Sequence, residues 1–186
     1  MKAVFLDRDG TILEEKGYVT VPDAVNVLPG VAEAIVSLRA QGWKVFVVSN
    51  QAAVAKGLIS EDELARINER MVMMLGMAGA VLDGIYCCPH HPDGTEHEYA
   101  RECDCRKPKP GLLEQAAGEH DLDLAESVLI GDSLRDIQAG KAAGARATVL
   151  VLTGHGPSSS AEDHGADFVA KDLADAVHWL AGPGGA

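Results

Sequence analysis

Short apolar runs alternate with longer segments of helical periodicity along most of this chain. The runs are rich in Val, Ile and Leu, as are strands that are buried on both faces of a parallel sheet. They lie at Ala3–Leu6, Val45–Ser49, Ile85–Cys88, Val128–Ile130 and Thr148–Leu152, with a weaker one at Phe168–Val169. This alternation predicts an α/β fold: a single Rossmann-like domain with a parallel sheet and helices on both faces.

The helical segments carry their own start and stop signals. Ser60 and Glu63 form a capping box ahead of a helix whose apolar residues share one face. Gly42 is placed to end an earlier helix, because glycine readily adopts the left-handed conformation at a helix C-terminus. We expect helices over Gly30–Gln41, from Ser60 onward, from Pro110 to about His120, from Asp132 or Ser133 to about Gly144, and around His178.

Residues 89–110 break this rhythm, because they hold three His, two Cys and four Pro with little apolar periodicity. A loop of about 20 residues is unusual inside a compact domain unless it is functional or tied down. We therefore expect a long functional loop here, and a flexible tail over residues 182–186. Since no internal repeat or domain boundary interrupts the pattern, residues 1–186 are predicted to form one domain.

Composition narrows the classes of protein to which the chain can belong. Its 186 residues are 47 % hydrophobic, which suffices for one buried core and argues against disorder. The net charge of −12, without a basic patch, disfavours a nucleic-acid partner. No apolar run reaches the roughly 18 residues of a membrane span, and the N-terminus leads directly into a strand. We expect a cytoplasmic monomer with neither a membrane nor a nucleic-acid partner.

Two aspartates, Asp7 and Asp9, follow the first predicted strand in the stretch "FLDRDGT". Carboxylates placed this close repel each other unless a cation or a shared proton neutralises them. A calcium loop is disfavoured, because it needs Gly at its sixth position and Glu at its twelfth, whereas Gly10 stands fourth and Tyr18 twelfth from Asp7. A solvated turn at a strand end is the plain alternative for the pair taken alone.

Polar side chains also follow other predicted strands. The carboxyl ends of parallel strands meet at one edge of a sheet, where active sites form. Together these segments offer carboxylates, a hydroxyl, an amide and cations, which are the groups that phosphoryl transfer needs around its nucleophile, its divalent cation and the phosphate. The residues are Ser49 and Asn50 in "VVSNQ", Arg106 and Lys107 in "CRKPKP", and Asp132 and Asp136 in "LIGDSLRD".

These stretches, in this order, resemble the motifs of the haloacid dehalogenase superfamily of phosphatases. The resemblance implies that Asp7 is the nucleophile, which forms an aspartyl-phosphate, and that Asp9 is the general acid and base. The neighbouring carboxylate should favour the protonated form of Asp9, which suits it to protonate the leaving oxygen. The resemblance also implies Mg²⁺ on the carboxylates of Asp7 and Asp132 and the backbone carbonyl of Asp9, and a phosphate site formed by Ser49, Asn50, Arg106 and Lys107.

Two further assignments stay open at the same predicted site. Asp136 lies one helical turn beyond Asp132, where it either orients the metal ligands or Lys107 or is a solvated helix residue. Histidines without partner spacing, among them His155, are expected at the surface. A receiver-like phospho-switch could use a similar acidic pocket, but it would not need the acid and base that Asp9 offers.

Cysteine and histidine residues form a second candidate site. Cys88-x-His90 and Cys103-x-Cys105 are two close ligand pairs separated by a loop, which is the general plan of a closed zinc site. The spacing inside each pair is tighter than usual, so buried thiols and a redox function stay open as alternatives. Cys87 points to the opposite face of its strand from Cys88, and we expect it to pack inside.

The stretches "YCCPHHPDG" and "CDCRKPKPG" resemble the subfamily of heptose bisphosphate and histidinol-phosphate phosphatases. The resemblance implies a small phosphorylated sugar as substrate, specifically the 7-phosphate of a heptose 1,7-bisphosphate. Histidinol phosphate or another small phosphomonoester is the alternative. The resemblance also implies Zn²⁺ on Cys88, His90, Cys103 and Cys105, in a loop of about residues 88–106 that would hold Arg106 and Lys107 toward the phosphate.

The chain departs from this subfamily at several positions near the site. Ala52 and Ala53 stand where a serine and a glycine are usual, Lys56 replaces an arginine, and Ser133 replaces a lysine that often follows the motif aspartate. These departures bear on the substrate more than on the chemistry. Because no long insertion follows the first or second motif, we expect an enzyme without a cap domain, with specificity left to short loops such as Leu13–Val27.

Overall fold

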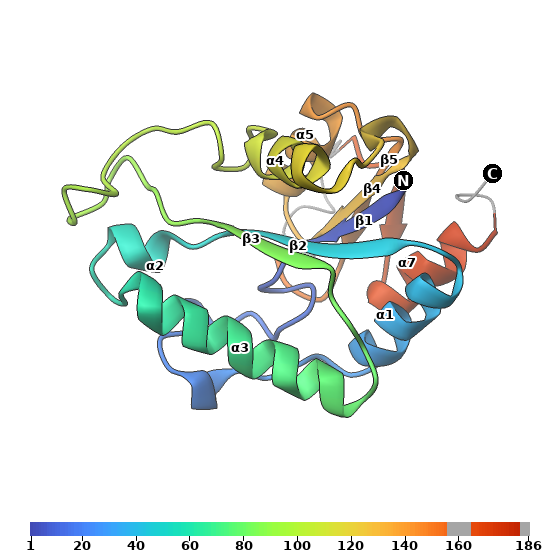
Figure 1. Ribbon diagram of the computed structural model, residues 1–186, viewed down its shortest axis with the longest axis horizontal. Coiled ribbons are helices and arrows are strands. Elements are labelled where there is room, and N and C mark those ends of the chain that lie inside the picture. Colours follow the sequence, from blue (N-terminus) through green and yellow to red (C-terminus); the bar gives the residue numbers. More distant parts are fainter. Residues whose placement is uncertain (156–164, 183–186) are drawn as a thin grey trace.

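Six parallel strands form the centre of the molecule, and helices cover both faces of the sheet (Figure 1). The computed structural model describes residues 1–155 and 165–182. The strands are β1 (Ala3–Leu6), β2 (Lys44–Asn50), β3 (Gly84–Cys88), β4 (Val128–Gly131), β5 (Ala147–Val151) and β6 (Phe168–Ala170). The helices are α1 (Val31–Ala40), α2 (Ala52–Ala55), α3 (Glu61–Met77), α4 (Gly111–His120), α5 (Leu134–Ala142) and α7 (Leu173–Leu180), with 3-10 turns η1 (Pro22–Ala24) and η2 (Leu124–Glu126).

The strand order is β3-β2-β1-β4-β5-β6, and every pairing is parallel. The predicted α/β class and the six predicted strands are therefore confirmed. The chain winds outward in one direction from β1 and in the other from β4, so the loops after these two strands diverge and leave a crevice at their carboxyl ends. Asp7 lies directly at this point, since its N–H donates to the carbonyl of Ile130 at 2.9 Å.

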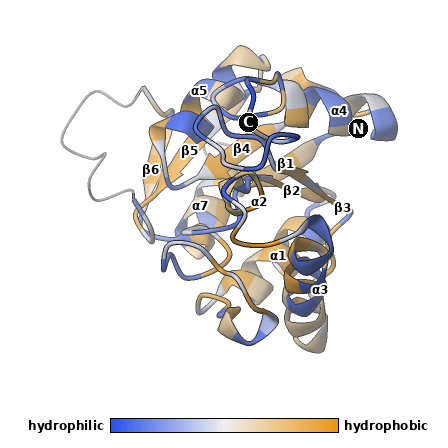
Figure 2. Ribbon diagram, turned by 90° about the vertical axis from the view of Figure 1, so that its left-hand side faces the viewer, coloured by the Kyte–Doolittle hydropathy of each residue, from blue (hydrophilic) through white to orange (hydrophobic). Residues whose placement is uncertain are grey.

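The core has two halves, because successive residues of a strand face opposite sides of the sheet. Val4 and Leu6 of β1 pack with α1, α3 and α7, whereas Ala3 and Phe5 pack with α4 and α5. All four are fully buried. Hydrophobic colours accordingly concentrate in the strands of the sheet (Figure 2). Aliphatic packing on both faces holds the strand ends rigidly, which gives the side chains that follow them defined positions.

Most of the predicted helix signals are confirmed. The Ser60–Glu63 capping box is present at the start of α3, and Ser133 caps α5. Pro110 lies at the N-cap of α4, one position earlier than its predicted place in the first turn. Helix α2 was not predicted, because four residues are too few to show a period.

The long loop that follows β3 is irregular, as predicted, but it is attached to the rest of the molecule. The N–H groups of Thr95 and Glu96 donate to the carbonyl of Ala55 in α2 at 2.7 and 2.9 Å. Figure 1 shows this loop extending from the sheet beside α2. The described residues between β1 and α1 form only a loop with the short turn η1, so that connection holds no cap domain.

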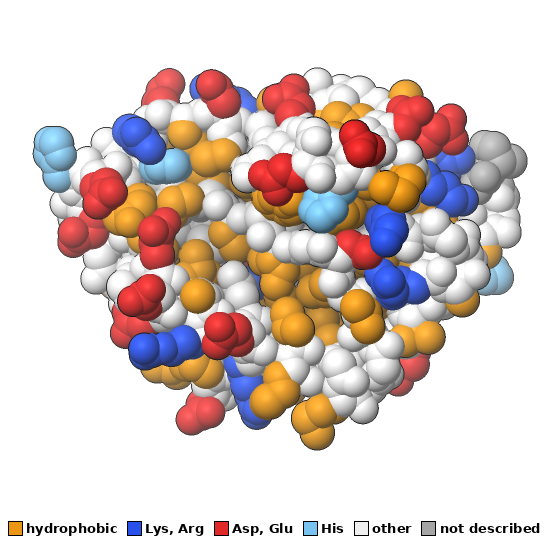
Figure 3. Space-filling model, in the orientation of Figure 1, with side chains coloured by type: hydrophobic (Ala, Val, Ile, Leu, Met, Phe, Trp, Pro, Cys, Tyr) orange, Lys and Arg blue, Asp and Glu red, His pale blue; other side chains and the backbone are white. Residues whose placement is uncertain are grey.

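Charged groups are distributed over the surface. On the face shown in Figure 3, acidic side chains are spread widely and lysines and arginines lie singly or in pairs between them. Among the described residues, no helix is both long and apolar enough to cross a membrane. The predicted tail falls largely outside the described residues, and the extent of the domain over 1–186 stays a prediction.

Asp83 provides a test of how the start of β2 is held. Its carboxylate accepts from the N–H of Val45 at 2.9 Å and from Lys44 Nζ at 3.0 Å, and it also pairs with Arg39. Burial raises the pKa of Asp83, but these donors outweigh burial, and the pKa is lowered overall. Stability from this carboxylate is thus present above the unfolded pKa of about 4 and is lost as the pH falls through the folded value.

We predict that Asp83→Asn lowers the free energy of unfolding by about 1–2 kcal/mol at pH 7. The difference should shrink as the pH falls below about 4, because the Asp83 carboxylate of the unfolded wild-type chain, which keeps the ordinary pKa, is protonated first and this favours unfolding. Urea unfolding of both proteins at several pH values measures it. A difference that stayed constant down to pH 3 would show that the charge of Asp83 does not stabilise the fold.

Candidate active site

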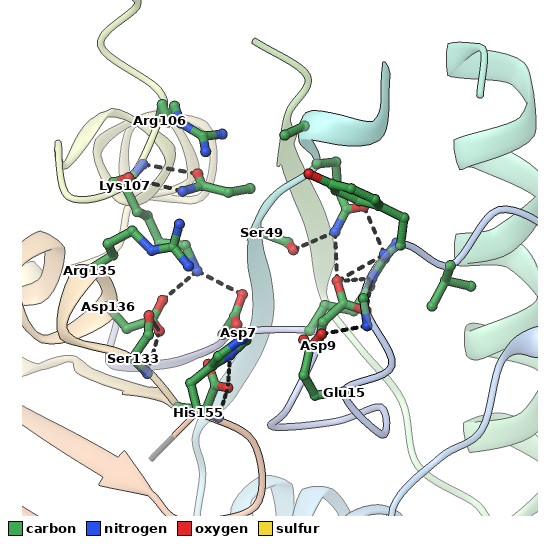
Figure 4. Close-up of a pocket in the computed structure, with 18 of the residues that line it drawn as sticks. Asp7, Asp9, Glu15, Ser49, Arg106, Lys107, Ser133, Arg135, Asp136 and His155 are labelled. Atoms are coloured by element: carbon green, nitrogen blue, oxygen red, sulfur yellow. Dashed lines mark hydrogen bonds and ion pairs between the residues drawn. The ribbon is translucent and has the colours of Figure 1, made fainter. Parts of the chain in front are cut away.

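A cavity of about 400 Å³ opens at the carboxyl ends of β1, β2 and β4 (Figure 4). This volume suits a small-molecule ligand. The lining places carboxylates beside cations, as a site for a charged ligand requires. The structure brings every residue predicted for the phosphate site to this cavity: Asp7, Asp9, Ser49, Asn50, Arg106, Lys107, Asp132 and Asp136.

Lys107 is the central cation of the cavity. Its ammonium group lies 2.7 Å from Asp7 Oδ1 and 2.6 Å from Asp136 Oδ1, and it donates to the carbonyl of Val48 at 2.7 Å. Burial acts to lower the pKa of Lys107, but the two carboxylates outweigh burial and raise it. The side chain, only 2 % exposed, therefore stays charged and cross-links three elements around the cavity.

Asp7 has an unusually high proton affinity in the absence of a bound cation. Burial raises its pKa most, Lys107 opposes the rise, and Asp136 and Asp132 add to it, so that the pKa reaches about 7. The neighbouring carboxylates thus add to the effect of burial and favour the protonated form of Asp7. Its neighbours leave negative charge that one ammonium group cannot balance.

The donor set around Asp7 fits a hard divalent cation. Carboxylate oxygens of Asp7, Asp132 and Asp136 lie within 4.8 Å of one another. Three carboxylates face one ammonium group, and carboxylate oxygens are the ligands that Mg²⁺ prefers. Gly10 lies against this group: it has φ +83°, and an added Cβ would come within 2.2 Å of Asp132 Oδ2. Only glycine allows the backbone to approach the carboxylate this closely.

Asp136 is part of this buried group, and the solvated alternative for it is wrong. Its side chain is 1 % exposed and forms the ion pair with Lys107. Its Oδ2 also accepts from the N–H and hydroxyl of Ser133 at 3.1 and 2.6 Å. Asp136 therefore orients Lys107 while it caps α5.

His155 is exposed, as expected, but it also contacts the site, which the sequence did not predict. Its backbone N–H and its Nδ1 lie 2.7 and 3.0 Å from Asp132 Oδ2. It follows β5, whose carboxyl end lies beside that of β4. The one sequence signal for His155 is its position shortly after a predicted parallel strand. Spacing along the chain does not show that this strand lies beside β4, so the contact with Asp132 could not be predicted.

The other predicted residues make contacts of their own around the cavity. Asn50 exchanges hydrogen bonds of 2.9 and 3.0 Å with the backbone of Lys107, so it positions that residue. Ser49 is buried and accepts from Gln51 Nε2 at 2.8 Å. The carboxylate of Asp9 faces Gln51 and Arg8, away from the Asp7 group. Arg8 and Gln51 were not predicted from the sequence.

Cations gather at the rim of the cavity. Arg106 is half-buried, and burial lowers the pKa of its guanidinium group. Cys88 opposes this effect, whereas the nearby charge of Arg135 adds to it. Burial also lowers the pKa of His91, with contributions from Arg106, Lys56 and Arg135. Sequence analysis missed Arg135, although it lies inside a quoted motif, in the first turn of α5. In the part of the chain that the structure describes, neither Arg106 nor Arg135 pairs with a carboxylate.

The four predicted zinc ligands lie together at the base of the long loop. The three sulfur atoms of Cys88, Cys103 and Cys105 are 3.1 to 3.4 Å apart, and His90 Nδ1 lies 3.4 and 3.7 Å from two of them. Ligands about 2.3 Å from a tetrahedral zinc would lie roughly this far apart. All three are free thiols, so the group fits a closed metal site.

Cys87 lies outside this group, as expected. Its Sγ accepts from Asn68 Nδ2 of α3 at 3.6 Å, on the other side of the sheet from the Cys88 sulfur. Arg106 follows the last cysteine directly and donates to the carbonyl of His90 at 3.0 Å. The loop that holds the Cys3His group is thus joined to the rim of the cavity.

Comparison with known proteins gives a consistent result. Residues 104–176 match the family model described as HAD-hydrolase-like. The chain is 44 % identical over 173 residues to the D-glycero-beta-D-manno-heptose-1,7-bisphosphate 7-phosphatase of Photorhabdus laumondii, covering 93 % of this chain and 92 % of the relative. The enzyme of that name from Escherichia coli K12 is 42 % identical, with 93 % and 90 % covered.

Solved structures show the same similarity. A D,D-heptose 1,7-bisphosphate phosphatase from B. bronchiseptica, complexed with magnesium and phosphate, has a TM-score of 0.86 and 38 % identity, covering 97 % of this chain and 98 % of its own. The corresponding protein from Burkholderia thailandensis has a TM-score of 0.73 and 30 % identity, with 98 % and 99 % covered.

We predict that the metal-free protein binds one Zn²⁺ at the Cys3His group. Reactive thiols, counted with a chromogenic disulfide in denaturant-free buffer, should fall on binding, and the Tm should rise because the metal ties the loop together. Cys103→Ser should abolish tight binding. Cys87→Ser is the matched control and should bind zinc as the wild type does; loss of binding in this control would place the metal elsewhere.

Proposed function

This chain belongs to the haloacid dehalogenase-like hydrolases, in the branch of the heptose bisphosphate phosphatases, and from that premise we propose the reaction that it catalyses. It is a magnesium-dependent phosphatase that removes the 7-phosphate of D-glycero-beta-D-manno-heptose 1,7-bisphosphate. The observation that carries the proposal is that Asp7, Lys107 and Asp132 lie in one cavity, in the crevice at the carboxyl ends of β1 and β4.

Asp7 is the nucleophile in this proposal. Lys107 contacts Oδ1, so we assign the attack on phosphorus to Oδ2. A carboxylate can approach a phosphate only when the negative charges of both are screened, and Lys107 supplies part of that screening. Bound Mg²⁺, held by the carboxylates of Asp7 and Asp132 and the backbone carbonyl of Asp9, would supply the rest.

The reaction then follows two steps. Asp7 displaces the sugar oxygen to form an aspartyl-phosphate, while Asp9 gives its proton to that oxygen. Asp9 next takes a proton from a water molecule, whose oxygen attacks phosphorus and frees Asp7. Asp136 and Asn50 hold Lys107 in place through both steps, by its ammonium group and its backbone respectively.

The rim cations support a substrate with a second phosphate. Arg106 and Arg135 line the cavity and lack carboxylate partners among the described residues, so an anion remote from the reacting phosphorus would meet positive charge there. Ser133 replaces the lysine that is usual in the subfamily, and Arg135, two residues later, provides positive charge in the same cavity. The zinc loop positions Arg106, which follows Cys105 and donates to the carbonyl of His90.

The proposed reaction predicts that wild-type enzyme with Mg²⁺ releases many phosphates per chain from heptose 1,7-bisphosphate, all from C7. Asp7→Asn should lower kcat/KM by at least ~10³-fold, because the nucleophile is lost. Phosphate release, with ³¹P NMR of the product, measures both. Preference for histidinol phosphate in a substrate panel would reassign the substrate, and release of less than one phosphate per chain would favour a phospho-switch.

A second prediction concerns the rim. Arg135→Met should raise KM for the bisphosphate about tenfold, the loss expected for one charge-assisted contact, and leave KM for heptose 7-phosphate unchanged. Arg135→Lys, which keeps the charge, should fall between the two. Steady-state kinetics on both substrates decides the matter: an equal rise of KM on both would mean that Arg135 does not bind the second phosphate.

A further inference from the structure

Arg8 is the largest fully buried side chain among the residues that the structure describes, with 1 % exposed, and it carries a charge. It lies between the two aspartates of the first motif, yet the proposed reaction gives it no task. A buried guanidinium group is costly unless its donors are satisfied by acceptors of good geometry. Its partners therefore indicate what it holds in place.

Three side chains accept hydrogen bonds from the guanidinium group. Nε and Nη2 donate to Asp9 Oδ2 at 3.1 and 2.9 Å, Nη2 also donates to Gln51 Oε1 at 2.8 Å, and Nη1 donates to Asn68 Oδ1 at 2.9 Å. Asn68 belongs to α3, and its amide group is oriented by the contact of Nδ2 with Cys87. Gln51 is likewise oriented, because its Nε2 donates to Ser49.

The two oxygens of Asp9 are held very differently. Oδ2 accepts from Arg8 Nε, Arg8 Nη2 and Gln51 Nε2, the last at 2.8 Å. Among the described residues, Oδ1 receives a single longer contact of 3.3 Å, from Arg8 Nε. Asp9 is 18 % exposed and lines the cavity. The fixed oxygen is thus turned to the protein, and the less engaged oxygen is the one available to a ligand.

We propose that Arg8 is a positioning residue for the acid and base of this reaction: together with Gln51 it anchors Asp9 Oδ2, so that proton transfer takes place at Oδ1. The inference rests on the proposed function of Asp9. The inference accounts for the burial of Arg8 and for the contact of its Nε and Nη2 with Asp9. It also accounts for Asn68 of α3, which accepts from Arg8, and for Ser49 of β2, which orients Gln51. A lysine could not replace it fully, because an ammonium group cannot offer the same planar fork.

In the proposed reaction Asp9 Oδ1 donates a proton in the first step and accepts one in the second. In the first step the Oδ1–H bond breaks as the P–O bond to the sugar breaks, the electron pair of that bond stays on the sugar oxygen, and the proton joins it there. Asp9 is then a carboxylate, which Arg8 and Gln51 stabilise. In the second step the attacking water gives its proton to Oδ1, its oxygen bonds to phosphorus, and the bond to Asp7 breaks with its electron pair returning to the carboxylate.

The test compares leaving groups that differ in their need for a proton. A sugar alkoxide must be protonated as it leaves, whereas 4-nitrophenolate leaves without a proton. Arg8→Met should therefore lower kcat/KM on heptose 1,7-bisphosphate by about 10- to 100-fold, at or below the lower end of the range of general acid catalysis because Asp9 itself is kept, and kcat/KM on 4-nitrophenyl phosphate by less than about threefold. Gln51→Met should act in the same direction, and it replaces Arg8→Met should that variant fail to fold. Arg8→Lys should restore part of the rate on the sugar substrate.

Two controls separate this inference from the proposed function. Asp9→Asn must itself show the selective loss on the sugar substrate; an equal loss on both substrates would overturn the role of Asp9 and with it that of Arg8. If Asp9→Asn is selective but Arg8→Met and Gln51→Met lower both rates equally, the inference alone is overturned. Arg39→Met, which removes an ion pair with Asp83 at the opposite end of β2, controls for lost stability and should leave the ratio of the two rates unchanged.

Discussion

The ammonium group of Lys107 joins the end of β1, the end of β2 and the first turn of α5, through Asp7, the carbonyl of Val48 and Asp136. A lysine buried this completely is stable only because all three acceptors are in place. Burial, together with the neighbouring carboxylates of Asp136 and Asp132, raises the pKa of Asp7, and the excess of carboxylates around Lys107 creates the demand for a divalent cation. The single positive charge of Lys107, set against the carboxylates around it, thus determines the need for a further cation in the site.

Asp7 and Asp9 are separated by one residue but lie in different electrostatic surroundings. Asp7 faces Lys107 and other carboxylates, whereas Asp9 faces Arg8 and Gln51. Gly10, which follows Asp9, leaves room for Asp132 beside this turn, because a side chain at residue 10 would overlap the Asp132 carboxylate. In the proposed reaction the two aspartates therefore take different roles, nucleophile and acid and base, since the difference between them comes from their neighbours.

The irregular loop after β3 shows how a segment without regular structure can still be positioned. The Cys3His group lies together at its base, and the N–H groups of Thr95 and Glu96 in its middle donate to the carbonyl of Ala55. Arg106 and Lys107 follow Cys105 in the chain, so the cysteine group lies only one or two residues from the cavity. The loop thereby serves as both a rim and a support for the central cation, in a molecule whose first connection carries no cap domain.

The sequence by itself determined the strands, the Ser60 capping box and eight of the residues that line the cavity, from Asp7 to Asp136, because each depends on local periodicity or on its position in a motif near a strand end. Only the tertiary structure decided how those residues are paired. Asp136 is buried against Lys107, His155 reaches Asp132 from β5, and Arg8 holds Asp9 against α3, through contacts between segments far apart in the chain. Burial and ion pairing depend on such distances in space, which spacing along the chain does not contain.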